Sequence, residues 1–160
     1  AWPSTASFSP SPGRLTLVMF AHPRCPCTRA SMSELDRIMS AAGDRAAAWI
    51  LFARPASVDA TWAETDLVAH ARRIPNTQVI DDRGGREAAL FGAMTSGHLF
   101  VFDERGELQL SGGLTAARGH EGPSLGREDV LALLSRRAPL AQTHAVFGCP
   151  ISSPATGAQR

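Results

Sequence analysis

The sequence contains no tyrosine, few aromatic residues and no marked excess of charge. Aromatic residues make up 6% of the 160 residues, and the formal net charge is +1 at pH 7. Stacking of nucleic-acid bases needs aromatic side chains, and a nearly balanced charge gives no electrostatic reason to expect such a partner. The composition therefore predicts no binding to nucleic acid.

Long hydrophobic runs are also missing. The longest candidate covers Leu15 to Ala21, whereas a helix that spans a bilayer needs about 20 apolar residues. The run instead predicts a buried strand. A chain of 160 residues is long enough to bury a core of its own, and we expect a single domain.

The front of the chain has an unusual composition. It begins at Ala1 without an initiator methionine, and residues 3–13 are rich in serine and proline, as linkers are. These two features predict that a signal peptide or membrane anchor preceded the sequence, and they indicate an exported or anchored protein of the periplasm or cell envelope. We expect a linker over residues 1–13, one domain over 14–138 and a tail over 139–160.

Apolar runs and turn residues predict alternating strands and helices. Strands are expected at residues 15–21, 46–53, 77–80, 99–102 and 107–110, and helices at 26–42, 58–73, 84–91 and about 128–137. A hairpin turn is expected at Asp103 to Gly106. The alternation predicts right-handed crossovers and a mostly parallel sheet, to which the late hairpin adds an antiparallel edge.

Three cysteines are present, and an odd number leaves at least one thiol without an intramolecular partner at any moment. Two of them form Cys25-Pro26-Cys27, between the first predicted strand and the first predicted helix. Pro26 falls in the first turn of that helix, where a missing N–H costs nothing. Two thiols at a strand-to-helix turn are typical of thiol–disulfide exchange or of a site for a soft metal.

This order of elements, with two cysteines at the start of the first long helix, resembles the thioredoxin fold of the TlpA-like envelope reductases over residues 14–138. The turn from Asp103 to Gly106 matches the Asp-x-x-Gly hairpin turn of that family. The resemblance implies an α/β fold with a central mixed β-sheet flanked by helices on both faces, and a redox pair of Cys25 and Cys27. Four stretches are also similar to the RedB-type thioredoxin-like proteins: His22 to Ser31, Ser111 to Gly113, Arg118 to Gly122 and Phe147 to Pro150.

The sequence departs from the usual family pattern in two places. Only Pro26 separates the two cysteines, where two residues are usual. The proline that usually has a cis bond opposite the pair would align near Gly97, and Pro75 is the other candidate. Two family properties depend on this proline, namely the edge where a substrate peptide docks and the exclusion of metal.

The charges near the pair predict a lowered pKa for one of its thiols. A helix N-terminus offers partial positive charge and free N–H groups, and no acidic residue occurs before Glu34. The basic residues nearby are Arg14, Arg24, Arg29 and His22. We expect Cys25, at the exposed end, to be the nucleophile and Cys27, further in, to be the resolving thiol. A disulfide across one residue is strained and easily reduced, which favours a disulfide donor or isomerase over a strong reductant.

Three further side chains are candidates for the site. His120 lies in the Gly-rich loop of residues 112–126, which in the resembled fold is on the same face as the redox pair, and it is a candidate proton shuttle or ligand. Glu121 beside it is a candidate general base. Cys149 lies in the tail, and if the tail folds back over the domain this thiol becomes a resolving thiol or part of a metal site.

The sequence thus predicts a thiol–disulfide oxidoreductase of the bacterial cell envelope, without a cofactor, that acts on a redox partner or a disulfide-containing protein. Cys25 attacks the partner and Cys27 releases it. The alternative is a module that binds or delivers copper as Cu(I), held by Cys25, Cys27 and a third ligand. The candidates for this third ligand are His22, His98, His120, His144 and Cys149. A redox-inert interaction domain is the third interpretation.

Overall fold

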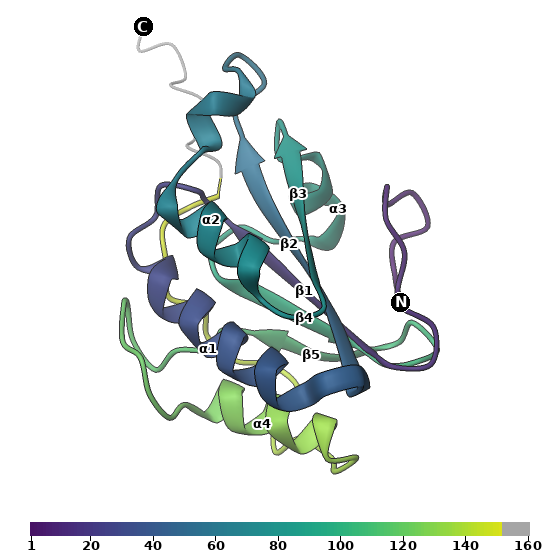
Figure 1. Cartoon of the computed structure of the whole chain (residues 1–160). Helices are drawn as coiled ribbons and strands as arrows, with labels where there is room; N and C mark the ends of the chain where they lie inside the picture. Colours follow the sequence, from purple (N-terminus) through teal and green to yellow (C-terminus); the bar gives the residue numbers. More distant parts are fainter. Residues whose placement is uncertain (152–160) are drawn as a thin grey trace, which may run out of the picture.

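A five-stranded mixed sheet forms the centre of the molecule, which is known from a computed structural model that describes residues 1–151 (Figure 1). The strands are β1 (Leu15–Ala21), β2 (Ala46–Arg54), β3 (Thr77–Arg83), β4 (His98–Phe102) and β5 (Leu108–Gly112). Their order is β3-β2-β1-β4-β5, with β1, β2 and β3 parallel and with β4 antiparallel to both of its neighbours. The predicted mixture of parallel crossovers and a late hairpin is confirmed.

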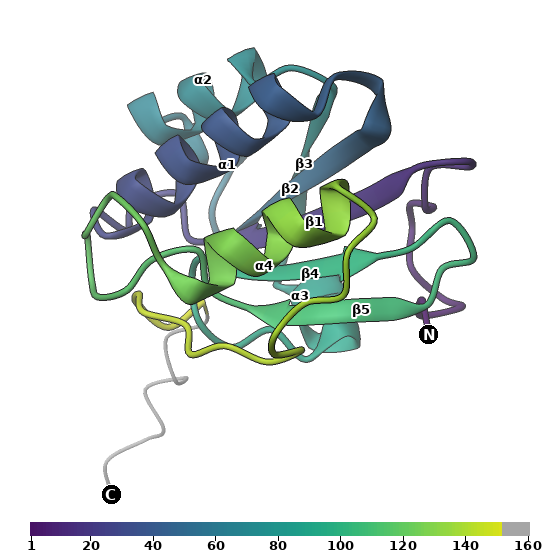
Figure 2. The ribbon, with the colours of Figure 1, turned by 90° about the horizontal axis from the view of Figure 1, so that it is seen from below.

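Helices cover both faces of this sheet. They are α1 (Thr28–Ala42), α2 (Asp66–Arg73), α3 (Arg86–Phe91) and α4 (Leu125–Leu134), with short 3-10 helices at Gly43–Arg45 and Ala60–Ala63. Figures 1 and 2 show α1, α2 and α4 on one face and α3 on the other. The α/β class predicted from the sequence is confirmed. No helix within residues 1–151 is both long enough and apolar enough to cross a membrane.

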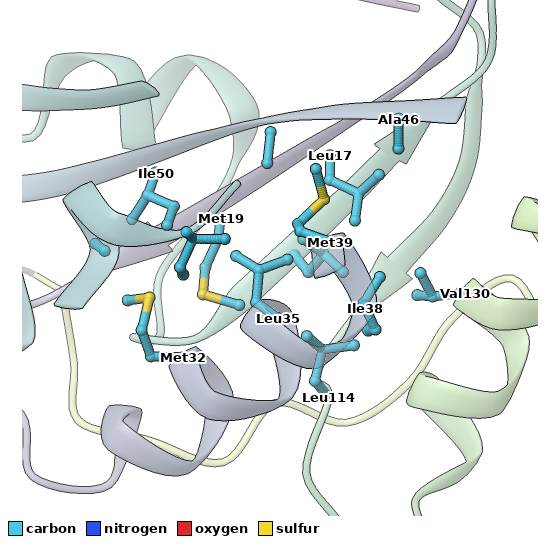
Figure 3. Packing of buried hydrophobic residues seen from close by; sticks show 14 of the residues in the cluster. Leu17, Met19, Met32, Leu35, Ile38, Met39, Ala46, Ile50, Leu114 and Val130 are labelled. Atoms are coloured by element: carbon cyan, nitrogen blue, oxygen red, sulfur yellow. The ribbon is translucent and has the colours of Figure 1, made fainter. Parts of the chain in front are cut away.

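The two faces carry two separate hydrophobic clusters, because successive side chains of a strand point to opposite sides. Leu17 and Met19 of β1 face α1, where they pack with Leu35 and Met39 (Figure 3). Phe20 of the same strand belongs to the cluster on the α3 side. The start of α1 therefore follows the central strand of the sheet, which is buried on both faces.

The N-terminal segment packs onto the α3 side of the sheet. The rings of Trp2 and Phe8 lie 5.1 Å apart, and Phe8 is only 7% exposed. Trp2 also contacts the ring of Phe102 of β4 at 4.8 Å. The segment that the sequence predicts as a linker, residues 1–13, thus lies against the domain as far as Phe8, because these aromatic side chains find an apolar surface despite the serine and proline around them.

Side-chain caps explain two differences between the predicted and observed helices. The helix expected at residues 58–73 is split, because Asp59 caps the 3-10 helix and Thr65 caps α2, each through a bond from a backbone amide. The last helix begins at Leu125, earlier than expected, because the hydroxyl of Ser124 accepts a hydrogen bond from the amide of Arg127 at 3.1 Å.

The C-terminal segment follows the outer edge of β5 after α4 ends. Ser111 of β5 donates its amide to Gln142 and accepts the amide of His144, at 2.8 and 3.0 Å. The imidazole of His144 is bonded to the buried carboxylate of Asp129 at 2.9 Å. In Figure 2 the segment, in yellow, runs along β5 toward the start of α1. This path brings the end of the chain to the turn that carries Cys25.

Candidate active site

Cys25 lies in the turn between β1 and α1. Its amide donates to the carbonyl of His22 at 3.1 Å, and its own carbonyl accepts from the amide of Thr28 at 3.2 Å. Cys27 is the residue that precedes the first turn of α1, with helical backbone angles. The sequence correctly placed both cysteines at the start of this helix.

The burial of the two cysteines is the reverse of the expected one. Cys25 is 2% exposed, whereas Cys27 is half-buried and Pro26 is exposed. The expectation that Cys25 occupies the exposed end and Cys27 lies further in is therefore wrong. The reason is the C-terminal segment, which covers Cys25 from outside.

Within the C-terminal segment, Cys149 is the residue that covers Cys25. Its Sγ lies 2.9 Å from the Sγ of Cys25, and its amide N lies 3.4 Å from the same sulfur. All three cysteines are free thiols. A disulfide bond is about 2.05 Å long, so the sulfur atoms of Cys25 and Cys149 need to approach by less than ~1 Å to be joined.

Hydrogen bonds make Cys25 the more acidic of these two thiols. Burial raises the pKa of Cys25, but the thiol of Cys149, the hydroxyl of Thr28 and the amides of both residues stabilise the thiolate and lower its pKa to about 7. The hydrogen bond with Cys25, burial, and the nearby charges of Cys25 and Cys27 raise the pKa of Cys149 to about 11. The lowered pKa agrees with the prediction, although hydrogen bonds rather than arginines cause it.

His22 and Arg24 hold the shape of the turn. The His22 ring accepts the amide of Arg24 through Nδ1 at 3.1 Å, and burial and then the charge of Arg24 lower its pKa. The guanidinium of Arg24 donates twice to the carbonyl of Trp62, at 3.0 and 3.2 Å, and lies 4.6 Å from the centre of its ring. Both side chains are thus structural parts of the turn, while Arg29 is exposed on α1.

A buried hydroxyl pair next to the turn was missed by sequence reasoning. Ser96 is fully buried, its Oγ accepts the amide of His22 at 2.8 Å, and it lies 2.6 Å from the hydroxyl of Thr28. Its only sequence signal was its place beside Gly97, where the family proline would align. All peptide bonds within residues 1–151 are trans, and Pro75 precedes β3, at the opposite end of the parallel strands from Cys25.

The Gly-rich loop lies beside Cys27, as expected. A Cβ added to Gly119 would lie 4.0 Å from the Cα of Cys27. His120 is exposed, and the carboxylate of Glu121 lies 3.5 Å from the guanidinium of Arg37 on α1. The loop therefore reaches the site, but Glu121 is engaged in an ion pair, which does not support its expected role as general base.

The loop is held by a carboxylate that sequence reasoning also missed. Glu34 of α1 is fully buried, and one of its oxygens accepts the amide of Gly122 at 2.8 Å. Arg37 and Arg127 neutralise it at 2.7 and 2.9 Å. A glutamate about two helical turns past Cys27 carried no signal in the sequence beyond being the first acidic residue.

The ligand set expected for copper is not assembled in the part of the chain that the structure describes. There, no three side chains of His, Cys, Asp or Glu form a group that could hold a metal ion. The other candidate histidines are engaged elsewhere: His98 bonds to Ser111 at 2.8 Å and stacks on Phe100, and His144 bonds to Asp129.

Comparisons with known proteins agree with this architecture. No family model and no curated protein matches the chain. Among solved structures, an uncharacterised conserved protein from Geobacillus kaustophilus has a TM-score of 0.71 at 20% identity, over 90% of this chain and 79% of its own. The exposed lipoprotein thioredoxin Etrx1 from Streptococcus pneumoniae has a TM-score of 0.53 at 19% identity, over 78% and 85%.

The chain has a thioredoxin-like fold. A hypothetical protein from Sinorhizobium meliloti 1021 shares the architecture with a TM-score of 0.67 at 22% identity, over 88% of this chain and 80% of its own. At such identities the likeness establishes the fold alone. Within this fold, Cys25 lies in the turn before α1 and its sulfur contacts that of Cys149.

Proposed function

We propose that this chain is a thiol–disulfide oxidoreductase of the bacterial cell envelope, of the TlpA-like or RedB type, with Cys25 as its nucleophile. One observation carries the proposal: four hydrogen-bond donors around Cys25 lower its pKa to about 7. A free cysteine has a pKa of about 8.5, and the thiolate is the form that attacks a disulfide. At neutral pH roughly half of the Cys25 thiols are therefore in the thiolate form.

The first step is attack of the Cys25 thiolate on a partner disulfide. A bond forms between Cys25 Sγ and one partner sulfur, and the other partner sulfur leaves as a thiolate. In the cycle expected from the Cys25-Pro26-Cys27 pair, Cys27 then attacks Cys25 and releases the partner as a second thiol. The half-buried position of Cys27 beside Cys25 supports this step.

The location and partners follow from the same proposal. Etrx1, one of the neighbours, is an exposed lipoprotein thioredoxin, which supports an exported or membrane-anchored protein here too. The partner is a redox protein or a disulfide-containing substrate protein. A strained disulfide across one residue favours donation or isomerisation of disulfides.

Exchange kinetics beside a copper titration test the proposal. The purified protein is assayed for reduction of glutathione disulfide and insulin, and its Cu(I) affinity is measured in parallel. We expect rapid exchange that Cys25→Ser lowers by at least ~100-fold, because the attacking thiolate is gone. Slow exchange combined with tight stoichiometric Cu(I) binding would contradict the enzyme and favour the copper module.

A further inference from the structure

The last described residues of the chain, Phe147 to Ile151, which we call the strap, lie in an extended conformation against the segment before β4. The amide of Ser96 donates to the carbonyl of Cys149 at 2.8 Å, and the amide of Ile151 donates to the carbonyl of Met94 at 2.9 Å. Thr95 and Pro150 form an antiparallel bridge. This is how an extended peptide adds to an exposed backbone edge.

Three further contacts fix the strap in this place. Arg118 of the Gly-rich loop donates to the carbonyl of Gly148 at 2.7 Å. A Cβ added to Gly148 would lie 2.1 Å from the carbonyl oxygen of Ser96, so only glycine fits before the cysteine. Ile151 is 6% exposed and belongs to the hydrophobic cluster on the α3 side. Backbone, charge and apolar contacts together hold the Cys149 thiol against Cys25.

We propose that Cys149 is the resolving thiol of Cys25, and that the strap occupies the edge where the substrate peptide of this enzyme docks. The proposal rests on the proposed function, which supplies the nucleophile Cys25. Here Cys149, in place of Cys27, is the thiol that closes the cycle. It also defines the substrate class. An extended peptide with a glycine immediately before its cysteine reproduces the backbone bonds of the strap and fits beside Ser96.

The cycle uses two thiols of this chain, Cys25 and Cys149, and one disulfide of the partner. The strap leaves the edge and a partner disulfide takes its place. Cys25 Sγ then bonds to one partner sulfur, while the S–S bond of the partner breaks and its other sulfur leaves as a thiolate. The strap then returns, the Cys149 thiolate attacks Cys25 Sγ, and the bond between Cys25 and the partner breaks. The partner leaves as a thiolate that takes a proton from water, so that two thiols of the chain become one disulfide and one partner disulfide becomes two thiols.

The electrostatics of the pair suit this order of events. The charge on Cys25 is one of the causes that hold the pKa of Cys149 high. In the mixed disulfide Cys25 carries no charge, so that cause disappears when Cys149 has to react. The strap thiol is therefore protonated while Cys25 is the thiolate and becomes easier to ionise once Cys25 has reacted.

Disulfide mapping of the oxidised protein tests the pairing directly. The reduced protein is oxidised with glutathione disulfide, free thiols are alkylated, and tryptic peptides are identified by mass spectrometry. Cleavage at arginine places Cys25 and Cys27 together in peptide 25–29 and Cys149 in peptide 138–160. We expect these two peptides to be linked, with one alkylated thiol in the first. An unlinked peptide 25–29 with an internal disulfide would overturn the inference.

Two matched variants identify the thiol that acts. In Cys27→Ser we expect the linked peptides to persist, which assigns the bond to Cys25. In Cys149→Ser we expect the mixed disulfide with glutathione to accumulate and turnover to fall at least ~10-fold. The opposite pattern contradicts the inference but leaves the proposed function intact. Exchange that survives Cys25→Ser refutes the proposed function itself.

Gly148→Ala separates the strap from the chemistry, because it keeps all three thiols. The added methyl group cannot fit against Ser96, so the strap should leave its edge. At a pH above about 9, where Cys25 is ionised with or without the donors of the strap, Cys25 should then be alkylated at least ~10-fold faster. Arg118→Ala should also raise the rate at which Cys25 is alkylated, but by a smaller factor. The matched control is Arg105→Ala, which changes an exposed arginine of the β4–β5 turn. Thermal unfolding shows that each variant is folded, and unchanged alkylation in folded Gly148→Ala would contradict the docked strap.

Discussion

At the scale of single residues, the reactivity of Cys25 comes from donors that approach it from two sides. Thr28 belongs to its own turn, whereas the thiol and amide of Cys149 come from the far end of the chain. Sequence reasoning expected a lowered pKa from the helix N-terminus and the arginines. Arg24 was unsuited to that role because its guanidinium is engaged with Trp62. A count of nearby charges cannot show which way a side chain turns.

The first prediction concerns the ionisation of this thiol. In the reduced protein, the ultraviolet absorbance of the thiolate should rise with a midpoint near the Cys25 pKa of about 7. In Cys149→Ala the midpoint should move up, because the thiolate loses the donor that lowers its pKa most. Cys27→Ala is the control and should keep the midpoint. A midpoint near 8.5, as in a free cysteine, would contradict the hydrogen-bonded thiolate.

The same pKa makes the stability of the reduced protein depend on pH. The pKa of Cys25 is lower in the folded than in the unfolded chain, so ionisation favours the folded state. This contribution is fully present above about pH 8.5 and is lost as the pH falls through about 7. Cys149 has a raised pKa, so its contribution is lost as the pH rises toward about 11. The free energy of unfolding, measured in urea at several pH values, should rise between about pH 7 and pH 8.5 and should fall as the pH approaches about 11.

At the scale of elements, α1 connects the two halves of the site. Its start carries the cysteines, and about two turns later the buried Glu34 holds the Gly-rich loop through Gly122 and pairs with Arg127 of α4. The apolar periodicity predicted the helix and its buried face, which are confirmed. The role of Glu34 could not be predicted, because a charged residue on a helix is usually solvated and two of its partners, Gly122 and Arg127, lie more than 85 positions further along the chain.

Removal of the Glu34 carboxylate should therefore weaken both the fold and the placement of the loop. We expect Glu34→Ala to lower the free energy of unfolding by about 3 kcal/mol, the lower end of the cost of breaking a buried ion pair, because both arginines can reach water. Glu128→Ala, at an exposed position of α4, is the control and should cost less than about 1 kcal/mol. Equal losses in the two variants, measured by urea unfolding, would show that Glu34 does not anchor the loop.

At the scale of the whole molecule, the site is made by the two ends of the sequence. The strand-helix alternation predicted the sheet, the crossovers and the place of the Cys25-Pro26-Cys27 turn, and the structure agrees. The pairing of Cys25 with Cys149 could only be left open, because the path of the tail depends on close backbone approaches. Gly113 is one of them: a Cβ there would lie 2.6 Å from the carbonyl oxygen of Ala145. Such contacts leave no periodic pattern in the sequence.

Cys25 and Cys149 are far apart along the chain, and this separation sets how much a disulfide between them should stabilise the protein. A disulfide restricts the unfolded chain more strongly when it closes a longer loop. Cys25 and Cys149 are 124 positions apart, so their disulfide should stabilise the oxidised protein by about 5 kcal/mol in the chain-entropy model, against about 1.6 kcal/mol for a bond across one residue. The quantity to measure is the free energy of unfolding of oxidised and reduced wild type in urea at one pH. Cys149→Ser is the control, in which oxidation can close only the short loop and the difference should shrink to the smaller value. A small difference in wild type as well would mean that the two ends of the chain are not joined, and that Cys25 and Cys27 form the disulfide.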